Sequence, residues 1–198
     1  ALPISQSRRY KKKKSAGKAI LAWIIVLAIL AAAVFVFVSV FYEDTKKKLD
    51  EMNYPRTYST YVEKAAKDYD LDPALIYAVI HTESGFDPKA ESGVGAKGVM
   101  QMMPSSFEWL QEQRGCAGQY TEDDLFDPEI CIDYGSYLLK YFYDYYGTER
   151  SAIAAYNAGF VVSDWLSDTN YSSDGKNLDS IPYPETENYV DKVESAKE

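Results

Sequence analysis

The hydrophobic positions along this chain follow two different patterns. Residues 19–41 form an unbroken run of 23 apolar or small residues without a single charge. At the helical rise of 1.5 Å per residue such a run spans about 34 Å, which exceeds the roughly 30 Å of a bilayer core. A cleaved signal peptide has a shorter apolar region of about 7–15 residues. The pattern therefore predicts one N-terminal transmembrane helix over residues 19–42.

Beyond residue 56 the apolar positions recur at helical spacing, in short segments separated by Gly, Pro, Asp and Ser. Sustained alternation of apolar and polar residues, which would indicate strands, is missing from this part of the sequence. We therefore predict a mainly α domain, in which only the glycine-rich stretch 84–98 leaves room for a small β-hairpin. The predicted helices cover residues 58–69, 73–84, 105–112, 128–146, 149–157, 164–166 and 185–196.

One helix of this set carries an anomaly. Asp72 suits the N-cap, Pro73 suits the first helical turn, and Gly85 suits the C-terminal stop. Between them the apolar stripe consists of Leu75, Ile76, Val79 and Ile80. The next residue on that stripe is Glu83, and a carboxylate is seldom placed on a buried face without a partner or a purpose. Glu83 is therefore a candidate catalytic acid at a helix end.

The charge is divided sharply along the chain. Residues 1–42 carry seven basic side chains and no acidic one, which leaves 14 basic against all 30 acidic residues further on, a balance of −16. By the positive-inside rule we expect residues 1–18 to be a cytoplasmic basic tail, 43–56 a stalk, and 57–198 an extracytoplasmic domain of a single-pass protein in the cell membrane. A domain this acidic is a poor ligand for nucleic acid, so no nucleic-acid partner is expected.

Several familiar site types do not fit the sequence. The segment Gly93–Gly98 matches GxGxxG, but a helix precedes it where a dinucleotide fold needs a strand. With one histidine, His81, and two cysteines, we expect neither a metal site nor a cofactor. His81 also lies about 200° around its helix from Glu83, so we expect a surface or packing role for it.

The two cysteines, Cys116 and Cys131, both lie in the domain expected to be exported. Export permits a disulfide between them, and we predict that bridge. The alternative is that Cys131, on a helix, is a buried free thiol.

Three motifs give the chain a family resemblance. They are ESGFDPKAES from Glu83 to Ser92, GAKGVMQMMP from Gly95 to Pro104, and AYNAG from Ala155 to Gly159. In this order they resemble the soluble lytic transglycosylase family, whose members have a goose-lysozyme-like domain and cleave peptidoglycan glycan strands. A fourth segment, IPYPET with Tyr189 and Val190, is similar to the family's final motif. The resemblance covers about residues 57–192.

The resemblance implies a role for each matching residue. Glu83 would be general acid and then base, Ser92 and Gln101 would orient the N-acetylated sugars, and Met100 would line the cleft. Tyr156 would lie close to the catalytic carboxyl, Asn157 would hold the wall of the site, and Glu185 would support it from the last helix. Two residues depart from the family pattern: Val99 stands where Leu is usual, and Glu187 where Arg is common.

The implied reaction cleaves the β-1,4 bond between N-acetylmuramic acid and N-acetylglucosamine and forms a 1,6-anhydro sugar, using one carboxyl group. Two other classes stay open on the sequence alone. A muramidase on the same fold would need a second carboxylate, for which Asp87, Glu91 and Asp123 are candidates. A non-catalytic wall-binding module would need no acid, and the position of Glu83 speaks against it. The mode of cleavage, the physiological process and any protein partners are left undetermined.

Overall fold

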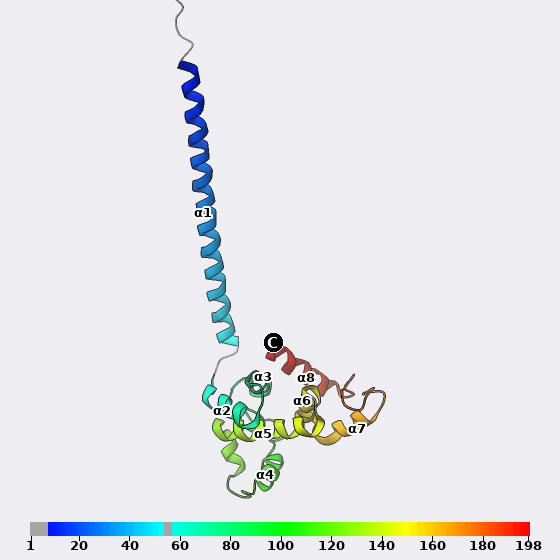
Figure 1. Cartoon of the computed structure of the whole chain (residues 1–198). Coiled ribbons are helices and arrows are strands. Elements are labelled where there is room, and N and C mark those ends of the chain that lie inside the picture. Colours follow the sequence, from blue (N-terminus) through cyan, green and yellow to red (C-terminus); the bar gives the residue numbers. More distant parts are fainter. Residues whose placement is uncertain (1–7, 54–56) are drawn as a thin grey trace, which may run out of the picture. The chain divides into compact units, whose positions relative to one another are not determined.

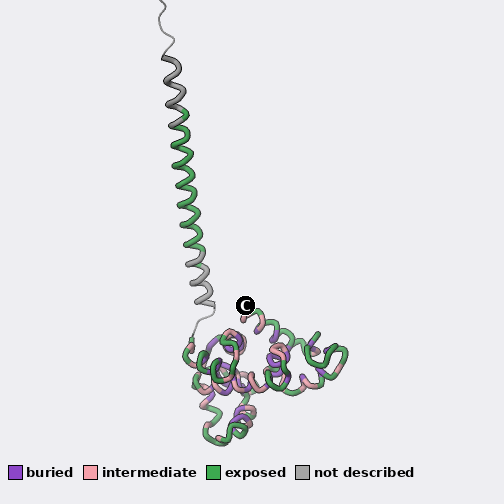
Figure 2. The backbone as a smooth tube through the Cα atoms, viewed as in Figure 1, coloured by how far each residue is buried: buried purple, intermediate pink, exposed green. Residues whose placement is uncertain are grey.

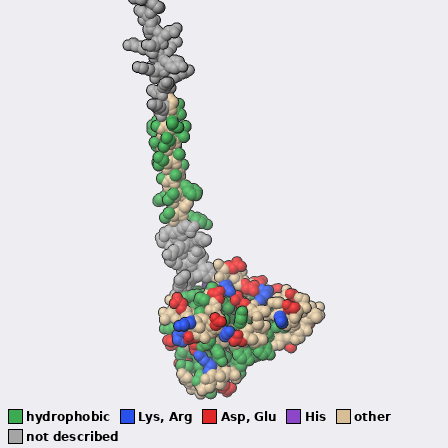
Figure 3. Space-filling model, in the orientation of Figure 1, with side chains coloured by type: hydrophobic (Ala, Val, Ile, Leu, Met, Phe, Trp, Pro, Cys, Tyr) green, Lys and Arg blue, Asp and Glu red, His purple; other side chains and the backbone are tan. Residues whose placement is uncertain are grey.

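A computed structural model describes residues 8–53 and 57–198, and the chain divides into two units, residues 1–55 and 56–198. The first unit contains α1 (Arg8–Asn53), within which Ala19–Tyr42 is long and apolar enough to cross a membrane. Its apolar side chains are exposed along the helix (Figure 3). The helix is longer than the predicted span because the flanking segments are rich in lysine, a good helix former, and contain no proline. The predictions for residues 1–7, in the basic tail, and for residues 54–56, in the stalk, concern positions outside the described residues.

The second unit is built from short helices, as the spacing of apolar positions predicts (Figure 1). The α-helices agree with the predicted ones to within a few residues, and the mainly α class is confirmed, whereas the two 3-10 helices were not predicted. In chain order they are α2 (Ser59–Tyr69), α3 (Pro73–Ser84), α4 (Pro104–Gln113), the 3-10 helix η1 (Glu122–Phe126), α5 (Pro128–Tyr146), α6 (Glu149–Ala158), the 3-10 helix η2 (Gly159–Val161), α7 (Val162–Ser167) and α8 (Pro184–Lys197).

Helix α5 is the central element of this unit. It packs against α2 on one side and against α6 on another, while α3 packs against α8. Figure 2 shows buried positions along α5 and along the sides of α3, α6 and α8 that face the interior. The apolar stripe predicted for α3 is fully buried, which confirms that this helix presents one face to the core. The end of that stripe is where Glu83 emerges.

Helix starts follow the expected chemistry in two cases and depart from it in one. The side chain of Asp72 accepts a hydrogen bond from Ala74 N, and that of Asp127 accepts one from Glu129 N. Helix α4 begins at Pro104 after Met103, without a side-chain cap, because proline's fixed φ suits the first turn and its missing N–H needs no partner there.

The glycine-rich stretch between α3 and α4 folds as a compact loop. In place of a β-hairpin it contains two isolated antiparallel bridges, Glu91 with Lys97 and Lys97 with Met102. The hydroxyl of Ser84 donates to Val99 O at 2.8 Å and ties the end of α3 to this loop. A side chain at Gly98 would meet Leu125 O at 2.0 Å. The loop therefore lies directly on η1 and the start of α5.

The predicted disulfide is wrong: Cys116 and Cys131 are both free thiols. Cys131 is buried in α5, where its sulfur accepts from Met100 N at 3.4 Å and its thiol points to Lys97 O at 3.8 Å. Cys116 lies elsewhere, with its sulfur 3.3 Å from the hydroxyl of Tyr134. Because each sulfur already packs against a different part of the fold, no bridge joins them, and the alternative of a buried thiol at Cys131 is confirmed.

The close approach at Gly98 gives a test of this packing. Gly98→Ala should destabilise the fold through both a left-handed backbone (φ +76°) and a clash with Leu125. Gly95→Ala is the matched control, because Gly95 also has positive φ (+89°) but open space around it. Backbone strain alone should cost about 1–2 kcal/mol, and the clash at Gly98 should add at least about 1 kcal/mol. Urea unfolding followed by tryptophan fluorescence measures both; equal destabilisation by the two variants would contradict the packing.

Candidate active site

Glu83 lies in the last turn of α3, at the point where the buried stripe of that helix reaches the surface. Its side chain is half-buried, and burial raises the pKa of its carboxyl from an ordinary value of 4.5 to about 7. A hydrogen bond from Tyr189 acts in the opposite direction and lowers that pKa. Near neutral pH a substantial fraction of this carboxyl is therefore protonated, as a general acid requires.

Tyr189 brings α8 into the site. Its buried hydroxyl donates to Glu83 Oε1 at 2.7 Å, across 106 positions of sequence. One carboxyl oxygen is thus held by the protein, and the other is left for chemistry. Burial beside this carboxylate also raises the pKa of the Tyr189 hydroxyl well above its ordinary value, so it stays a hydrogen-bond donor.

Tyr156 lies on α6. Burial, followed by the charge of Glu83, raises the pKa of the Tyr156 hydroxyl well above its ordinary value. That hydroxyl donates to Met100 O at 2.9 Å and lies 3.5 Å from the sulfur of Met102. Tyr156 therefore fixes the glycine-rich loop against α6.

Two residues of the loop, Ser92 and Gln101, carry polar groups that can form further hydrogen bonds. Ser92 Oγ accepts from Ala96 N at 2.9 Å, which leaves its hydroxyl proton available to a ligand. Gln101 uses its side-chain nitrogen to donate to Ala90 O at 3.1 Å and Gly98 O at 3.0 Å. Its backbone has positive φ (47°), an unfavourable conformation for a residue other than glycine. The two side-chain bonds hold it there.

The role predicted for Met100 is wrong. Its side chain is completely buried and packs against Gly135 of α5, where an added Cβ would meet the methionine sulfur at 2.5 Å. The loop turns at Gln101, so the methionine exposed to solvent is Met103, which has 38% of its surface accessible. The motif contains three methionines, and their order alone does not show which one faces solvent.

The two remaining candidates lie at the junction of α6 and α8. The hydroxyl of Thr186 donates to Asn157 Oδ1 at 2.8 Å, so Asn157 ties the end of α6 to the start of α8. Glu185 is exposed beside Thr186. His81 is exposed and packs against the ring of Phe86 at 6.1 Å between centroids.

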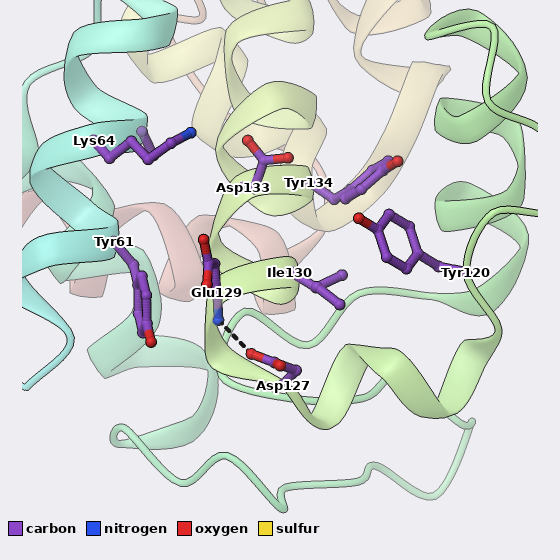
Figure 4. Close-up of a pocket in the computed structure, with 9 residues that line it drawn as sticks. Tyr61, Lys64, Tyr120, Asp127, Glu129, Ile130, Asp133 and Tyr134 are labelled. Atoms are coloured by element: carbon purple, nitrogen blue, oxygen red, sulfur yellow. Dashed lines mark hydrogen bonds between the residues drawn. The ribbon is translucent and has the colours of Figure 1, made fainter.

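Among the described pockets, the one with the most side chains around it does not contain Glu83. It is a hollow of about 340 Å³ between α2 and α5. Figure 4 shows Tyr61 on one side, Tyr120 on the other, and the side chains of Glu129, Ile130 and Asp133 between them. Asp133 is already bound to Arg114 at 2.6 Å and to the hydroxyl of Tyr69 at 2.5 Å. This hollow lies apart from the Glu83 site.

Sequence reasoning did not assign a role to Tyr189 or Met103. Tyr189 stands in the final segment of the resemblance, and its position on the buried face of a helix, four residues after Glu185, was a usable signal. Nothing in the sequence alone, however, pairs a tyrosine with a glutamate 106 residues away.

Comparison with known proteins identifies the family to which the domain belongs. Residues 60–178 match the family model described as the transglycosylase SLT domain. The soluble lytic murein transglycosylase of Escherichia coli K12 is 32% identical over 146 residues, 72% of this chain and 23% of that protein. Membrane-bound lytic murein transglycosylase C of Pectobacterium atrosepticum is 33% identical over 162 residues, 71% of this chain and 45% of its own length.

Comparison with solved structures leads to the same family. The 70 kDa soluble lytic transglycosylase of Escherichia coli superposes with a TM-score of 0.66 at 28% identity, covering 74% of this chain and 24% of that one. An inactive glutamate-to-glutamine mutant of lytic transglycosylase Slt from Pseudomonas aeruginosa gives 0.65 at 30% identity, covering 75% and 24%. This chain thus spans about a quarter of the length of its soluble relatives. Its helices, its loop and its matched residues 60–178 make it a member of the transglycosylase SLT domain family.

Proposed function

We propose that this protein is a peptidoglycan lytic transglycosylase, which cleaves the β-1,4 bond between N-acetylmuramic acid and N-acetylglucosamine and leaves a 1,6-anhydro sugar. The observation that carries the proposal is the state of Glu83, whose buried carboxyl has its pKa raised to about 7 and one oxygen held by Tyr189. Relatives named lytic murein transglycosylases support the substrate class.

In the first step, protonated Glu83 donates its proton to the glycosidic oxygen as the bond to the anomeric carbon breaks. The acetamido group of the muramic acid stabilises the positive charge that develops there. Glu83, now a carboxylate, then removes the proton from the 6-hydroxyl of the same sugar, and that oxygen bonds to the anomeric carbon. One group thus acts as acid and as base, and the proton balance closes without water.

The loop supplies the positioning groups. With both side-chain N–H groups of Gln101 engaged by Ala90 and Gly98, its carbonyl oxygen is the part left to accept from the N–H of an N-acetyl group. The hydroxyl of Ser92 donates to a sugar oxygen. Met103 offers an exposed apolar surface next to Gln101, and we assign to it the cleft contact that the sequence suggested for Met100. Asn157 and Glu185 hold the α6–α8 wall.

A hydrolytic mechanism needs a second carboxylate about 5–9.5 Å from the first. The three candidates are exposed, and two have other partners: Asp87 accepts from Lys89 N, and Asp123 from the amine of Lys97 at 3.0 Å. The causes of the raised pKa of Glu83 are burial, with the opposing bond from Tyr189, and include no neighbouring carboxylate. These observations favour the single-acid reaction over the muramidase.

The apolar segment of α1 suggests how the domain is held near its substrate. A membrane anchor over Ala19–Tyr42, with the basic tail in the cytoplasm, would hold the acidic domain outside the membrane beside the cell wall. The membrane-bound relatives support anchoring.

The central test is Glu83→Gln, which preserves size and polarity but transfers no proton. General acid–base groups contribute about 10²–10⁴-fold, and a site that uses one group for both steps should lose at least the upper part of that range. Wild-type protein should release muropeptides ending in 1,6-anhydro-N-acetylmuramic acid, which are lighter by one water than hydrolysis products. Mass analysis of the products from purified peptidoglycan measures both.

Glu91→Gln is the matched control, since it makes the same change at an exposed glutamate of the neighbouring loop and should retain activity. Products with a free reducing end would identify a hydrolase instead. Full activity of Glu83→Gln would refute the assignment altogether.

A second test addresses the hydrogen bond from Tyr189. Tyr189→Phe removes a donor that favours the ionised carboxyl, so the pKa of Glu83 should rise. Because the acid must be protonated to act, the alkaline decline of kcat/KM should shift to higher pH, while a lower kcat reports the loss of positioning. A pH–rate profile measures the shift. An unchanged alkaline limb would mean that Tyr189 does not act on Glu83 during turnover.

The topology can be tested independently of activity. The basic cluster before the span predicts that residues 57–198 are digested by protease added to intact cells stripped of outer wall layers. A cytoplasmic protein of the same cells is the control for lysis. Complete protection of the domain under these conditions would exclude the outward orientation.

A further inference from the structure

Aromatic side chains gather on the surface where α4, α5 and η2 meet. We call this group the aromatic platform and define it as Trp109 of α4, Tyr137, Tyr141 and Tyr145 of α5, and Phe160 of η2. The three tyrosines stand four residues apart, so they form one stripe along α5. Hydrophobic side chains are visible on the face that α4, α5 and α7 form in Figure 3, whose colouring counts tyrosine among them.

Four rings of the platform are in contact with one another, whereas the ring of Tyr137 packs against Tyr69 at 5.6 Å between centroids. The Trp109 and Tyr141 rings meet edge to face at 5.0 Å between centroids, and Tyr141 and Tyr145 stack at 6.3 Å. Phe160 closes the group, with its ring 6.2 Å from Tyr141 and 5.8 Å from Tyr145. Such contacts fix the rings in place, so a ligand meets a surface that is already ordered.

Trp109, Tyr137 and Tyr141 also pack against the core, but core packing does not account for Tyr145 and Phe160. Tyr145 keeps 58% of its surface accessible and Phe160 keeps 49%, although both contact other rings. Beside them is a hollow of about 350 Å³ lined by the three tyrosines of the stripe together with Lys140 and Asp144. Single exposed aromatics are ordinary on proteins, but a contiguous group beside a hollow marks a binding surface.

We propose that the aromatic platform binds the peptidoglycan glycan strand at a distance from Glu83, as a second contact for the same polymer. This inference rests on the proposed function, which supplies the substrate class. Sugar rings present apolar C–H faces that lie flat on aromatic rings, and hydroxyls at their edges that need polar partners. Lys140 and Asp144, paired with each other at 2.7 Å, and the tyrosine hydroxyls provide those partners at the rim.

The surrounding chain connects the platform with the Glu83 site. Phe160 follows Asn157 by three residues, at the point where α6 gives way to η2. Trp109 is on α4, which begins directly after Met103 of the loop. The two segments that carry Met103 and Asn157 therefore lead, along the chain, directly to residues of the platform.

Charge disfavours an anionic lipid surface as the occupant. Aromatic belts also occur at membrane interfaces, but there they accompany basic residues that are attracted to anionic lipids. The part of the sequence from residue 43 onward carries a balance of −16, which opposes such attraction. Lys140, the lysine of the hollow, is neutralised by Asp144.

The experiment compares strand lengths, using the full chain in nanodiscs of zwitterionic lipid. Binding is measured in the Glu83→Gln background, so that the strands stay intact, and turnover is measured with active Glu83. Tyr145→Ala should weaken binding of long glycan strands at least about fivefold, which corresponds to the lower end of stacking energies for one aromatic ring. On a short tetrasaccharide fragment its kcat/KM should match that of wild type.

Two control variants test whether the effect is specific to an aromatic ring at position 145. Tyr143→Ala removes an exposed tyrosine about 200° around α5 from Tyr141 and should leave long-strand binding unchanged. Tyr145→Trp keeps an aromatic ring and should restore binding. Circular dichroism of each variant confirms that the fold is intact.

The possible results separate the platform from the proposed function. Equal long-strand binding by Tyr145→Ala and Tyr143→Ala would overturn the platform, as would an equal loss of activity on short and long substrates. Loss of binding to anionic vesicles in place of glycan would assign the surface to a membrane and overturn the proposal. Failure of the active protein to cleave any strand would overturn the proposed function, while strand binding would still decide the platform.

Discussion

The burial of one carboxyl group at the end of an apolar helix face is the constraint on which the site depends. Taking an ionised group out of water is unfavourable, so burial raises the pKa of the Glu83 carboxyl. A group that holds this carboxyl by a hydrogen bond lowers the pKa again, and must not cancel the whole increase. Tyr189 does this from α8 with one hydrogen bond to one oxygen. The packing of α3 on α8 is therefore part of the chemistry as well as part of the core.

The loop after α3 is the second half of the same arrangement. It has no regular strand within the described residues, and its shape is set by contacts to carbonyl oxygens: Ser84 to Val99, Tyr156 to Met100, and the amide of Gln101 to Ala90 and Gly98. Each of these bonds comes from a side chain that the motifs contain. The motif residues thus build the loop first, and Ser92 and Gln101 in addition keep polar atoms with unused hydrogen-bonding capacity.

Sequence reasoning succeeded where the signal is local. Three features are read from neighbouring residues: the apolar period of α3, the Asp–Pro starts of α3 and α5, and the position of Glu83 on a buried stripe. The structure contains all three. It failed where the outcome depends on distant packing. Which methionine turns inward is decided by Gly135 on α5, and whether two cysteines meet is decided by the path of the whole chain. The contact between Tyr189 and Glu83 belongs to the same class.

The burial of Cys131 has a consequence for where such a domain can work. Its surroundings raise the pKa of the thiol to about 12, so the reactive thiolate is essentially absent at neutral pH. Thiolates react with oxidants and attack disulfides far faster than thiols do, and this sulfur is also shielded from solvent. The fold contains no disulfide between its two cysteines, so reducing agents have no such bridge to break. Neither an oxidising nor a reducing compartment should therefore alter the core around the glycine-rich loop.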